Sequence, residues 1–469
     1  MRVALINTPF IELYGPIKIA AGRYFPLGIG YIAAVLKMQG CQVRIIDPEA
    51  EGLDYSDVRE TLKNFNPDIV GLSSATPNFG QACKIARIAR EENVSTIILG
   101  GAHASSVPEL VLTKCADIDL VAIGEGEGIM SELCAGKSLQ EIDGIAYRKD
   151  GKIQFTVPRD PISNVDSLPL PARELVDLRL YRPNTYVDRG KNSVTLITSR
   201  GCPSRCVFCA SHTTLGRRFR AHSPEYVLHE MEYLMGKYGI KHFIFNDDTF
   251  TMNKNRVMEI CSLILQKNMK IEWYCFARVD TLDRELLSMM IKAGCNSIGF
   301  GIESGDATVL RNLKKGITLE QSRKAMRICN EFGLETYAFF ILGSPGETLD
   351  SVQRTVNFSK EIRPTLAFFN MMVPYPGTEV FNNLNLNSYT IDNWEDFVAI
   401  GTNSAVLSSS IPKDELQRLV SKANCSFYLR PFQIYRILKQ VRTWKRLKTY
   451  MLGGYGLLMQ VLSLKRWKR

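Results

Sequence analysis

Three cysteines in the segment SRGCPSRCVFCAS follow a CxxxCxxC spacing: Cys202, Cys206 and Cys209. Thiolates at this spacing can converge on one soft metal centre, as they do around iron–sulfur clusters. A cluster with four protein ligands normally needs a fourth cysteine, but the next one along the chain is the distant Cys261. Three cysteines would leave one iron of a 4Fe–4S cluster open, and an open metal position is where a substrate or cofactor binds.

A zinc site is an alternative use of the same cysteines. Zinc sites usually combine two CxxC pairs, or one CxxC pair with two histidines, and this segment has neither. His212 follows Cys209 by only three residues, so a Cys₃His zinc site stays open as an interpretation. Most of the twelve cysteines lie singly in apolar runs, which indicates a reducing compartment. The opening MRVALINTPF is interrupted by Asn7 and Pro9, so we expect no secretory leader and a cytoplasmic location.

The segments around the cysteine loop predict the scaffold that positions it. Six short runs rich in β-branched and aromatic residues recur with gaps long enough for a helix. They are SVTLITS (193–199), HFIFNDD (242–248), IEWYCFARVD (271–280), SIGFGIESG (297–305), ETYAFFILGSPGE (335–347) and AFFNMMVPYPGT (367–378). Six strand–helix units predict a partial (β/α)6 barrel, whose chemistry would lie at the C-terminal ends of the strands.

An earlier series of apolar runs predicts a separate sheet. VALIN, VRIID, DIVGLSS, TIILGGAH and LVAIGEGEG lack alternation and are separated by helical stretches, which is typical of a doubly wound parallel α/β sheet. IAYRKDGKIQF (145–155) predicts a hairpin that turns at Asp150-Gly151. We therefore predict four parts of the chain: a Rossmann-like domain (1–150), a Pro-rich linker (151–190), the partial barrel (191–380) and a helical C-terminal region (381–469).

The cysteine motif, with Phe208 before its last cysteine and on the first loop of a six-unit barrel, resembles the radical S-adenosylmethionine superfamily. The resemblance implies that the open iron chelates the methionine moiety and that reductive cleavage yields a 5′-deoxyadenosyl radical. It also implies further cofactor-binding residues at the strand ends, while no catalytic side chain is assigned. These are Asp247 or Asp248 at the methionine amino group, Glu303 at the ribose, Ile341 and Gly343 at the adenine, and Arg278 at the carboxylate or substrate. Arg278 could equally form a salt bridge at the rim of the barrel.

Residues 1 to about 380 resemble one class of that superfamily, in which a cobalamin-binding domain precedes the barrel. Anaerobic magnesium-protoporphyrin monomethyl ester cyclases and related methyltransferases form this class. The resemblance is carried by FPLGIGYIAAVLKMQG, GGAHASSVPE, GEGEG, DDTF, GIESG and PYPGTEVF. It implies cobalamin over the C-terminal edge of the first sheet, with its nucleotide tail beside small residues. These residues are Ser73, Ser74, Gly100 and Gly101.

One departure from that class concerns the cobalt ligand. The best-known cobalamin signature is an Asp-x-His-x-x-Gly loop after the first strand, but here the loop is Asn7-Thr8-Pro9-Phe10. Cobalamin stays the expectation, with no lower axial ligand assigned. His103 lies at a strand end and could approach the ligand, although a single histidine there is more often a packing residue.

The C-terminal segment 430–469 holds eleven Lys or Arg and no Asp or Glu, so it accounts for the net charge of +10. Its uncharged stretch is shorter than the roughly 20 residues that span a bilayer. A basic, aromatic-rich segment can lie in an anionic membrane interface, or it can pack on the barrel with its charges solvated. Nucleic-acid binding is not expected, because no recognition fold accompanies the charge. A basic tail favours a lipid, a tetrapyrrole or another apolar substrate.

Three functions are compatible with these features. The leading hypothesis is cobalamin-dependent methyl transfer to an unactivated carbon of a small molecule, with electrons from a donor such as a flavodoxin or ferredoxin. A second uses the same radical for cyclisation or rearrangement without methyl transfer. A third, of another class, is a non-catalytic cobalamin or iron–sulfur sensor. Cofactors carry the radical chemistry in the first two, so the protein's task would be to orient them.

Overall fold

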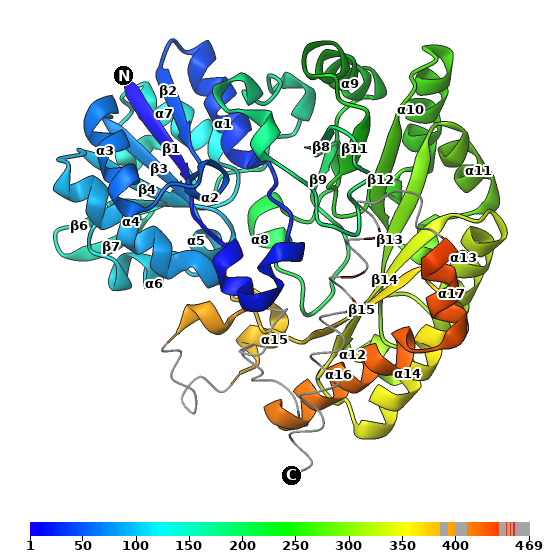
Figure 1. Ribbon diagram of the computed structural model, residues 1–469. Coiled ribbons are helices and arrows are strands. Elements are labelled where there is room, and N and C mark those ends of the chain that lie inside the picture. Colours follow the sequence, from blue (N-terminus) through cyan, green and yellow to red (C-terminus); the bar gives the residue numbers. More distant parts are fainter. Residues whose placement is uncertain (385–392, 399–409, 440–446, 448–450, 452–453, 455–469) are drawn as a thin grey trace.

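Two mainly parallel sheets covered by helices lie side by side in the computed structural model, which describes residues 1–384, 393–398, 410–439, 447, 451 and 454 (Figure 1). The first sheet has the strand order β2-β1-β3-β4-β5-β6-β7. Its first five strands in sequence are parallel, and β6 and β7 join as an antiparallel hairpin. The strands are β1 (Arg2–Asn7), β2 (Gln42–Ile46), β3 (Ile69–Ser73), β4 (Thr96–Gly100), β5 (Leu120–Ala122), β6 (Ile145–Lys149) and β7 (Lys152–Phe155).

Helices cover both faces of the first sheet, because strands such as β1 are apolar on both sides. α1 and α7 pack on one face, and α3, α4 and α6 pack on the other. The helices of this part are α1 (Leu27–Met38), α2 (Pro48–Glu51), α3 (Tyr55–Phe65), α4 (Phe79–Glu91), α5 (Ala102–Ser106), α6 (Pro108–Lys114) and α7 (Gly126–Cys134). The predicted doubly wound sheet is confirmed. Its order reverses between β1 and β3, which is where such sheets bind ligands.

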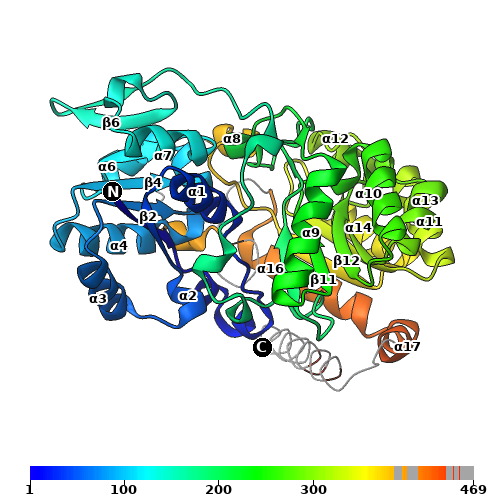
Figure 2. The same ribbon diagram turned by 90° about the horizontal axis from the view of Figure 1, so that it is seen from above.

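The second sheet holds six parallel strands in the order β8-β11-β12-β13-β14-β15, which confirms the predicted partial barrel. The strands are β8 (Ser193–Leu196), β11 (His242–Phe245), β12 (Glu272–Ala277), β13 (Cys295–Glu303), β14 (Glu335–Leu342) and β15 (Leu366–Met371). Helices lie on the outside, and Figure 2 shows them as an arc around the strands. They are α9 (Pro224–Tyr238), α10 (Lys254–Gln266), α11 (Arg284–Lys292), α12 (Ala307–Asn312), α13 (Leu319–Glu331) and α14 (Leu349–Ile362).

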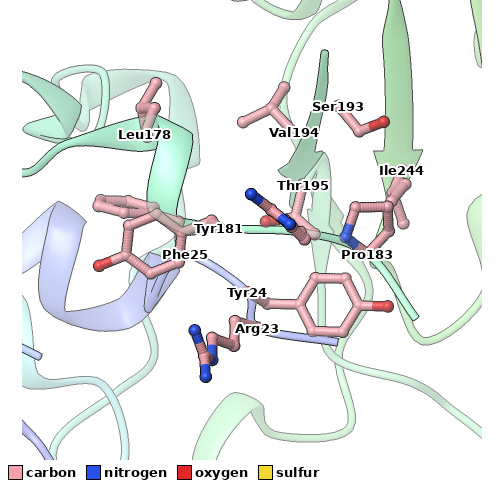
Figure 3. A pocket seen from close by; sticks show the side chains of 11 residues that line it. Arg23, Tyr24, Phe25, Leu178, Tyr181, Pro183, Ser193, Val194, Thr195 and Ile244 are labelled. Atoms are coloured by element: carbon pink, nitrogen blue, oxygen red, sulfur yellow. The ribbon is translucent and has the colours of Figure 1, made fainter. Parts of the chain in front are cut away.

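The segment between the sheets is held against both of them. Arg23 and Arg182 exchange two backbone hydrogen bonds, of 2.7 and 2.8 Å, which fix the linker to the residues before α1. A small cavity between these segments and β8 is lined by side chains that include Tyr24, Pro183 and Thr195 (Figure 3). Its volume of about 10 Å³ has room for one water molecule, so it is a packing gap rather than a cofactor site.

The described residues beyond β15 are helical, as expected. They form α15 (Glu379–Asn382), a 3₁₀ turn η10 (Trp394–Asp396), α16 (Lys413–Tyr428) and α17 (Pro431–Lys439). Most of the basic segment 430–469 lies outside the described residues. Within the described ranges, none of the helices is long and apolar enough to cross a bilayer. The first sheet extends through β7 to Phe155, and the three boundaries between the four parts of the chain remain predictions.

Candidate active site

The cysteine loop is closed at its base by a short antiparallel ribbon between β9 (Ser199–Arg200) and β10 (Arg220–Ala221), in which Arg200 and Arg220 are register partners. It contains α8 (His212–Leu215). The backbone of Val207 is tied to the barrel side by donating to the carbonyl of Leu313 at 3.1 Å and accepting from the amide of Val380 at 3.1 Å. The loop is therefore fixed at both its base and its middle.

All three loop cysteines carry free, partly exposed thiols. Burial raises the pKa of Cys209 to about 11 and also raises the pKa of Cys206, and the charge of a neighbouring cysteine adds to both shifts. Lys315 and Arg278 act in the opposite direction on the pKa of Cys206. Thiolates ligate metals, so a bound cationic centre would stabilise the ionised form of this group. Neighbouring free thiols with positive side chains beside them fit an iron–sulfur cluster.

His212 lies at the start of α8, where its Nδ1 is 3.1 Å from the carbonyl oxygen of Cys209. In the part of the chain that the structure describes, no three His, Cys, Asp or Glu side chains are grouped closely enough to hold a single metal ion. The ring of His212 is thus engaged by the loop's own backbone.

The structure separates the two adjacent aspartates after β11. Asp247 is fully buried and accepts hydrogen bonds from the amide and hydroxyl of Thr198, at 2.7 and 2.6 Å, and from the hydroxyl of Ser199 at 2.7 Å. Burial raises the pKa of Asp247, although nearby Arg256 opposes the shift. Asp248 is exposed and accepts a hydrogen bond from Ser211 of the cysteine loop. Asp247 therefore braces the end of β8, and Asp248 faces the cysteines.

Glu303 lies at the end of β13 with a φ of 65°, where the register with β14 shifts. Its Oε1 is 2.7 Å from Nζ of Lys315, and the side chain of Glu303 is buried while that of Lys315 is largely buried. Although burial lowers the pKa of Lys315, the charges of Glu303 and Cys206 raise it above its usual value. The ammonium also lies 5.9 Å from the centre of the Phe208 ring. Lys315 thus links the predicted ribose acid to the cysteine loop.

Sequence reasoning missed Lys315, because the Lys314-Lys315 pair resembles an ordinary solvated pair of charges. A separate signal was present in Gly301. A Cβ atom there would lie 2.4 Å from Oε1 of Glu303 and 2.7 Å from Nζ of Lys315, so a side chain at this point would displace the ends of both.

Arg278 occupies the rim of the barrel beside the cysteine loop. It forms a two-point salt bridge with Asp280, at 3.0 and 2.8 Å, and donates to the hydroxyl of Ser204 at 3.1 Å and the carbonyl of Lys315 at 3.1 Å. The structure therefore places Arg278 in a salt bridge, with one branch bound to the cysteine loop.

Ile341 and Gly343 occupy different surroundings at the end of β14. Ile341 shares an apolar cluster with Phe208, so these two predicted residues are brought together. Gly343 has a φ of 85°, and a Cβ atom there would lie 2.4 Å from Leu416 of α16. The carboxyl of Glu347 accepts the backbone amides of Gly343 and Ser344, and this closes the turn.

Aromatic side chains form a layer within the second sheet, two residues before Ile341 along β14. Phe339 and Phe368 are register partners and stack with ring centres 5.0 Å apart, and Phe276 lies 5.9 Å from Phe339. All three rings are partly exposed. A Cβ atom at Gly299 would lie 2.3 Å from the hydroxyl of Tyr274 and 3.0 Å from the ring of Phe276. The missing side chain makes room for this layer.

The predicted tail-pocket residues meet at the C-terminal ends of β3 and β4. Ser73 is paired with Gly100, and the amide of Ser74 donates to the Gly100 carbonyl at 3.0 Å. Gly101 has a φ of 96°, and a Cβ atom there would lie 2.5 Å from the carbonyl oxygen of Ser74. A Cβ atom at Gly100 would meet only ordinary contacts, the nearest at 3.7 Å. Gly101 thus lets the ends of β3 and β4 pack closely, and only Gly100 has room for a further atom beside the strands.

His103 is fully buried behind that edge. Its ring lies 4.6 Å from Phe79 and 4.9 Å from Trp394, and its Nδ1 is 3.3 Å from the hydroxyl of Thr76. Burial lowers its pKa to about 3, so the ring is neutral. The structure thus places His103 in packing contact with the segment that holds Trp394.

Two buried glutamates join the first sheet to the cysteine loop. Glu125 and Glu127, from the GEGEG segment after β5, contact Arg200 at 2.9 and 2.8 Å, and Glu125 also contacts Arg220 at 2.8 Å. Each of the four side chains is 4–6 % exposed. The two arginines close the base of the cysteine loop, so its orientation is set from the other sheet. The sequence analysis placed GEGEG at a strand end and in the family resemblance, but did not predict these ionic contacts.

Comparison with known proteins agrees with this geometry. Residues 196–359 match the Radical SAM superfamily, and residues 17–134 match a B12 binding domain. An uncharacterized methyltransferase of Pyrococcus horikoshii, PH0819, is 37 % identical over 412 residues, which cover 87 % of this chain and 88 % of that protein. The chain belongs to the radical SAM superfamily. Within it, this enzyme is in the class with a B12-binding domain, so the expected cofactors, a 4Fe–4S cluster, S-adenosylmethionine and cobalamin, are confirmed.

Two further similarities describe this radical SAM enzyme. The anaerobic magnesium-protoporphyrin IX monomethyl ester cyclase of Rubrivivax gelatinosus is 29 % identical over 396 residues, which cover 82 % of this chain and 70 % of the cyclase. The solved structure of OxsB, a cobalamin-dependent S-adenosylmethionine radical enzyme, superposes with a TM-score of 0.74. That match covers 99 % of this chain and 71 % of OxsB at 21 % identity, so it supports the fold.

Proposed function

We propose that this radical SAM enzyme transfers a methyl group to an unactivated carbon of a small molecule. The observation that carries the proposal is the ionic contact of Arg200 and Arg220 with Glu125 and Glu127, because it joins the cluster loop to the cobalamin-binding sheet. In the same region a Cβ atom at Gly377 would lie 2.6 Å from Thr213 of α8 and 2.8 Å from Ser106 of α5. Loops for both cofactors therefore border one site, as methyl transfer requires.

The chain's own residues would bind and orient the cofactors. Bound together, the cluster and S-adenosylmethionine supply a 5′-deoxyadenosyl radical, and cobalamin supplies the methyl group. Cys202, Cys206 and Cys209 would hold the cluster. Asp248 would face the methionine amino group, because Asp247 is already saturated by Thr198 and Ser199.

The ribose and the adenine would lie further along the barrel rim. Glu303 would accept the ribose hydroxyls, with Lys315 holding its carboxylate in place. Phe208 and Ile341 would contact the adenine from their shared apolar cluster. Gly343 would shape the turn beside the base, with its amide held by Glu347, and Arg278, through Ser204, would brace the loop.

The aromatic layer below this position indicates an apolar substrate. Phe276, Phe339 and Phe368 offer partly exposed rings and no charge. A lipid or a tetrapyrrole has the apolar surface that such a layer would contact. Electrons would come from a donor such as a flavodoxin or ferredoxin, and the free thiols agree with a cytoplasmic location.

Ring closure without methyl transfer is the second candidate, favoured by the 29 % identity to the magnesium-protoporphyrin cyclase. The products of S-adenosylmethionine separate the two reactions. A methyltransferase that also makes a radical converts one S-adenosylmethionine to S-adenosylhomocysteine and another to 5′-deoxyadenosine, whereas a cyclase makes no S-adenosylhomocysteine.

The test is an anaerobic turnover assay of the reconstituted holoenzyme with cobalamin, reductant and S-adenosylmethionine labelled in its methyl group. We expect both nucleoside products and transfer of the label to cobalamin. Formation of 5′-deoxyadenosine without S-adenosylhomocysteine would contradict methyl transfer and favour cyclisation. Absence of both products from an enzyme with a full iron content would point to the sensor.

A further inference from the structure

Helix α17 is docked on the molecule with its polar side inward. Gln433, the buried residue of this helix, is 0 % exposed, and its Nε2 donates to the carbonyl of Thr365 at 2.7 Å. Arg436, one turn later, donates to the carbonyl of Arg363 and to Oδ1 of Asn330, the latter at 2.9 Å. Polar groups at the start of β15 and the end of α13 therefore hold the helix.

The exposed side of α17 is apolar, and two of its residues, Phe432 and Tyr435, also border a groove beside the helix. Tyr435 is 65 % exposed and Leu438 is 59 % exposed, and Phe432 and Ile434 are also exposed. A surface helix of a globular protein normally buries such residues and leaves glutamine and arginine in water. Figure 2 shows α17 at the periphery of the molecule, beyond the helices of the barrel. A cluster of large apolar side chains in this position marks an interaction surface.

The surface beside this helix is basic. A groove of about 1220 Å³ runs between α17 and the N-terminal end of the barrel. Seven basic residues (Lys or Arg) and only four acidic residues (Glu) line it. Those glutamates already pair with basic side chains: Arg189 with Glu335, Lys191 with Glu272, Arg323 with Glu361 and Arg284 with Glu331. The positive charge that remains comes from Arg327, Arg363, Arg436 and Lys439. The sequence from 430 onward adds no acidic residue.

We propose that the outward side of α17 lies in the interface of an anionic phospholipid bilayer. The acyl layer of the bilayer would contact Phe432, Tyr435 and Leu438, and its negative headgroups would contact the basic groove. An anionic bilayer therefore matches both the apolar and the basic part of this surface. Glu272 and Glu335, the first residues of β12 and β14, line the groove, so the contact is at the end of the barrel opposite the cofactors. The enzyme would bind the membrane with its active site facing away from this contact.

Vesicle co-sedimentation of the full chain tests the proposal without any cofactor. We expect binding to vesicles of phosphatidylcholine mixed with phosphatidylglycerol, much weaker binding to phosphatidylcholine alone, and release by salt. A triple variant, Phe432→Ser, Tyr435→Ser and Leu438→Ser, should lower the partition coefficient roughly tenfold or more. Leu349→Ser on α14, which is 54 % exposed, is the matched control and should bind like wild type.

Two other occupants of the surface give different results. If a second copy of the chain covers α17, analytical ultracentrifugation will show a concentration-dependent dimer that the triple variant abolishes, with no vesicle binding. If another part of the same chain covers it, neither wild type nor variant will bind vesicles or dimerise. Either result overturns the proposal, as does a triple variant that binds anionic vesicles as well as wild type. Because the assay needs no turnover, its outcome is independent of the proposed methyl transfer.

Discussion

Substitution of one cysteine at a time distinguishes the three cluster cysteines from the other nine, because only the loss of a cluster ligand should remove iron from the protein. In the reconstituted protein, Cys206→Ala should abolish the iron–sulfur absorbance at roughly 400 nm, because two thiolates cannot retain the cluster. Cys425→Ala in α16 removes a partly buried thiol outside the site and is the control. Iron content and absorbance spectra measured anaerobically check both variants. A Cys206→Ala protein that keeps full absorbance would show that the ligands are misassigned.

The two aspartates after β11 should respond oppositely to amide substitution. Asp248→Asn should weaken S-adenosylmethionine binding roughly tenfold, about 1.4 kcal/mol, and leave stability unchanged. Asp247→Asn should instead lower the unfolding free energy by about 1–3 kcal/mol, because an amide cannot accept all three hydrogen bonds from Thr198 and Ser199. Equilibrium dialysis and urea unfolding measure the two effects. The reverse pattern would mean that Asp247 binds the cofactor.

At the residue scale, the sequence was sufficient for chemical types but not for all partners. The cysteine spacing is visible in the chain itself, and the acid at Glu303 was expected from the resemblance to the family. The choice between Asp247 and Asp248 is not, because it depends on which carboxylate the turn after β8 buries. Lys315 was missed for the same reason: its charge is buried by residues distant in sequence. The site residues were expected from the resemblance to a family, and their contacts support the roles that we propose for them.

The turn between β14 and α14 contains a carboxyl that should make stability depend on pH. Burial raises the pKa of Glu347 to about 7, so in the folded state it holds a proton that the unfolded chain releases near its usual value of 4.5. The unfolding free energy should therefore fall as pH rises from about 4.5 to 7, by about 3 kcal/mol, and stay level above that. Denaturant unfolding of wild type and Glu347→Gln checks this. A difference between the two proteins that is constant across this range would contradict it.

The ionic contact between the GEGEG segment and the cluster loop should be important for stability. Glu125→Gln leaves the buried guanidinium groups of Arg200 and Arg220 without a full partner and should lower the unfolding free energy by about 3 kcal/mol. Glu132→Gln, on helix α7 that follows Glu125 but in partly exposed pairs with Lys137 and Arg159, should change it by less than about 1 kcal/mol. Thermal or urea unfolding compares them. Equal effects of the two substitutions would show that the buried contact has no special role.

At the element scale, prediction succeeded where a strand is buried on both faces. All eleven parallel strands were expected from apolar runs of Val, Ile, Leu and Phe. A strand with one face in water would instead alternate apolar and polar residues. The helices followed from the gaps. The polarity of α17 could not be foreseen, because apolar residues of a helix are expected inside, and here Gln433 occupies that position. Its surroundings, rather than its own sequence, reverse its orientation.

At the scale of the whole molecule, the two sheets work as one unit. β9 and β10 hold the cluster loop at the C-terminal edge of the barrel, and Glu125 and Glu127 connect that loop to the first sheet. The segment around Trp394 packs against His103 at the cobalamin-binding edge. Contacts of this kind join residues tens to hundreds of positions apart, so hydrophobic periodicity carries no trace of them. The relative placement of the cofactors is therefore a property of the fold.

The central claim is that three thiolates leave one iron open for S-adenosylmethionine. Its most direct test is anaerobic reduction of the reconstituted enzyme with dithionite in the presence of S-adenosylmethionine, followed by quantification of 5′-deoxyadenosine. We predict its formation in wild type and its loss in Cys206→Ala. A wild-type enzyme with a full complement of iron that makes no 5′-deoxyadenosine would contradict the account.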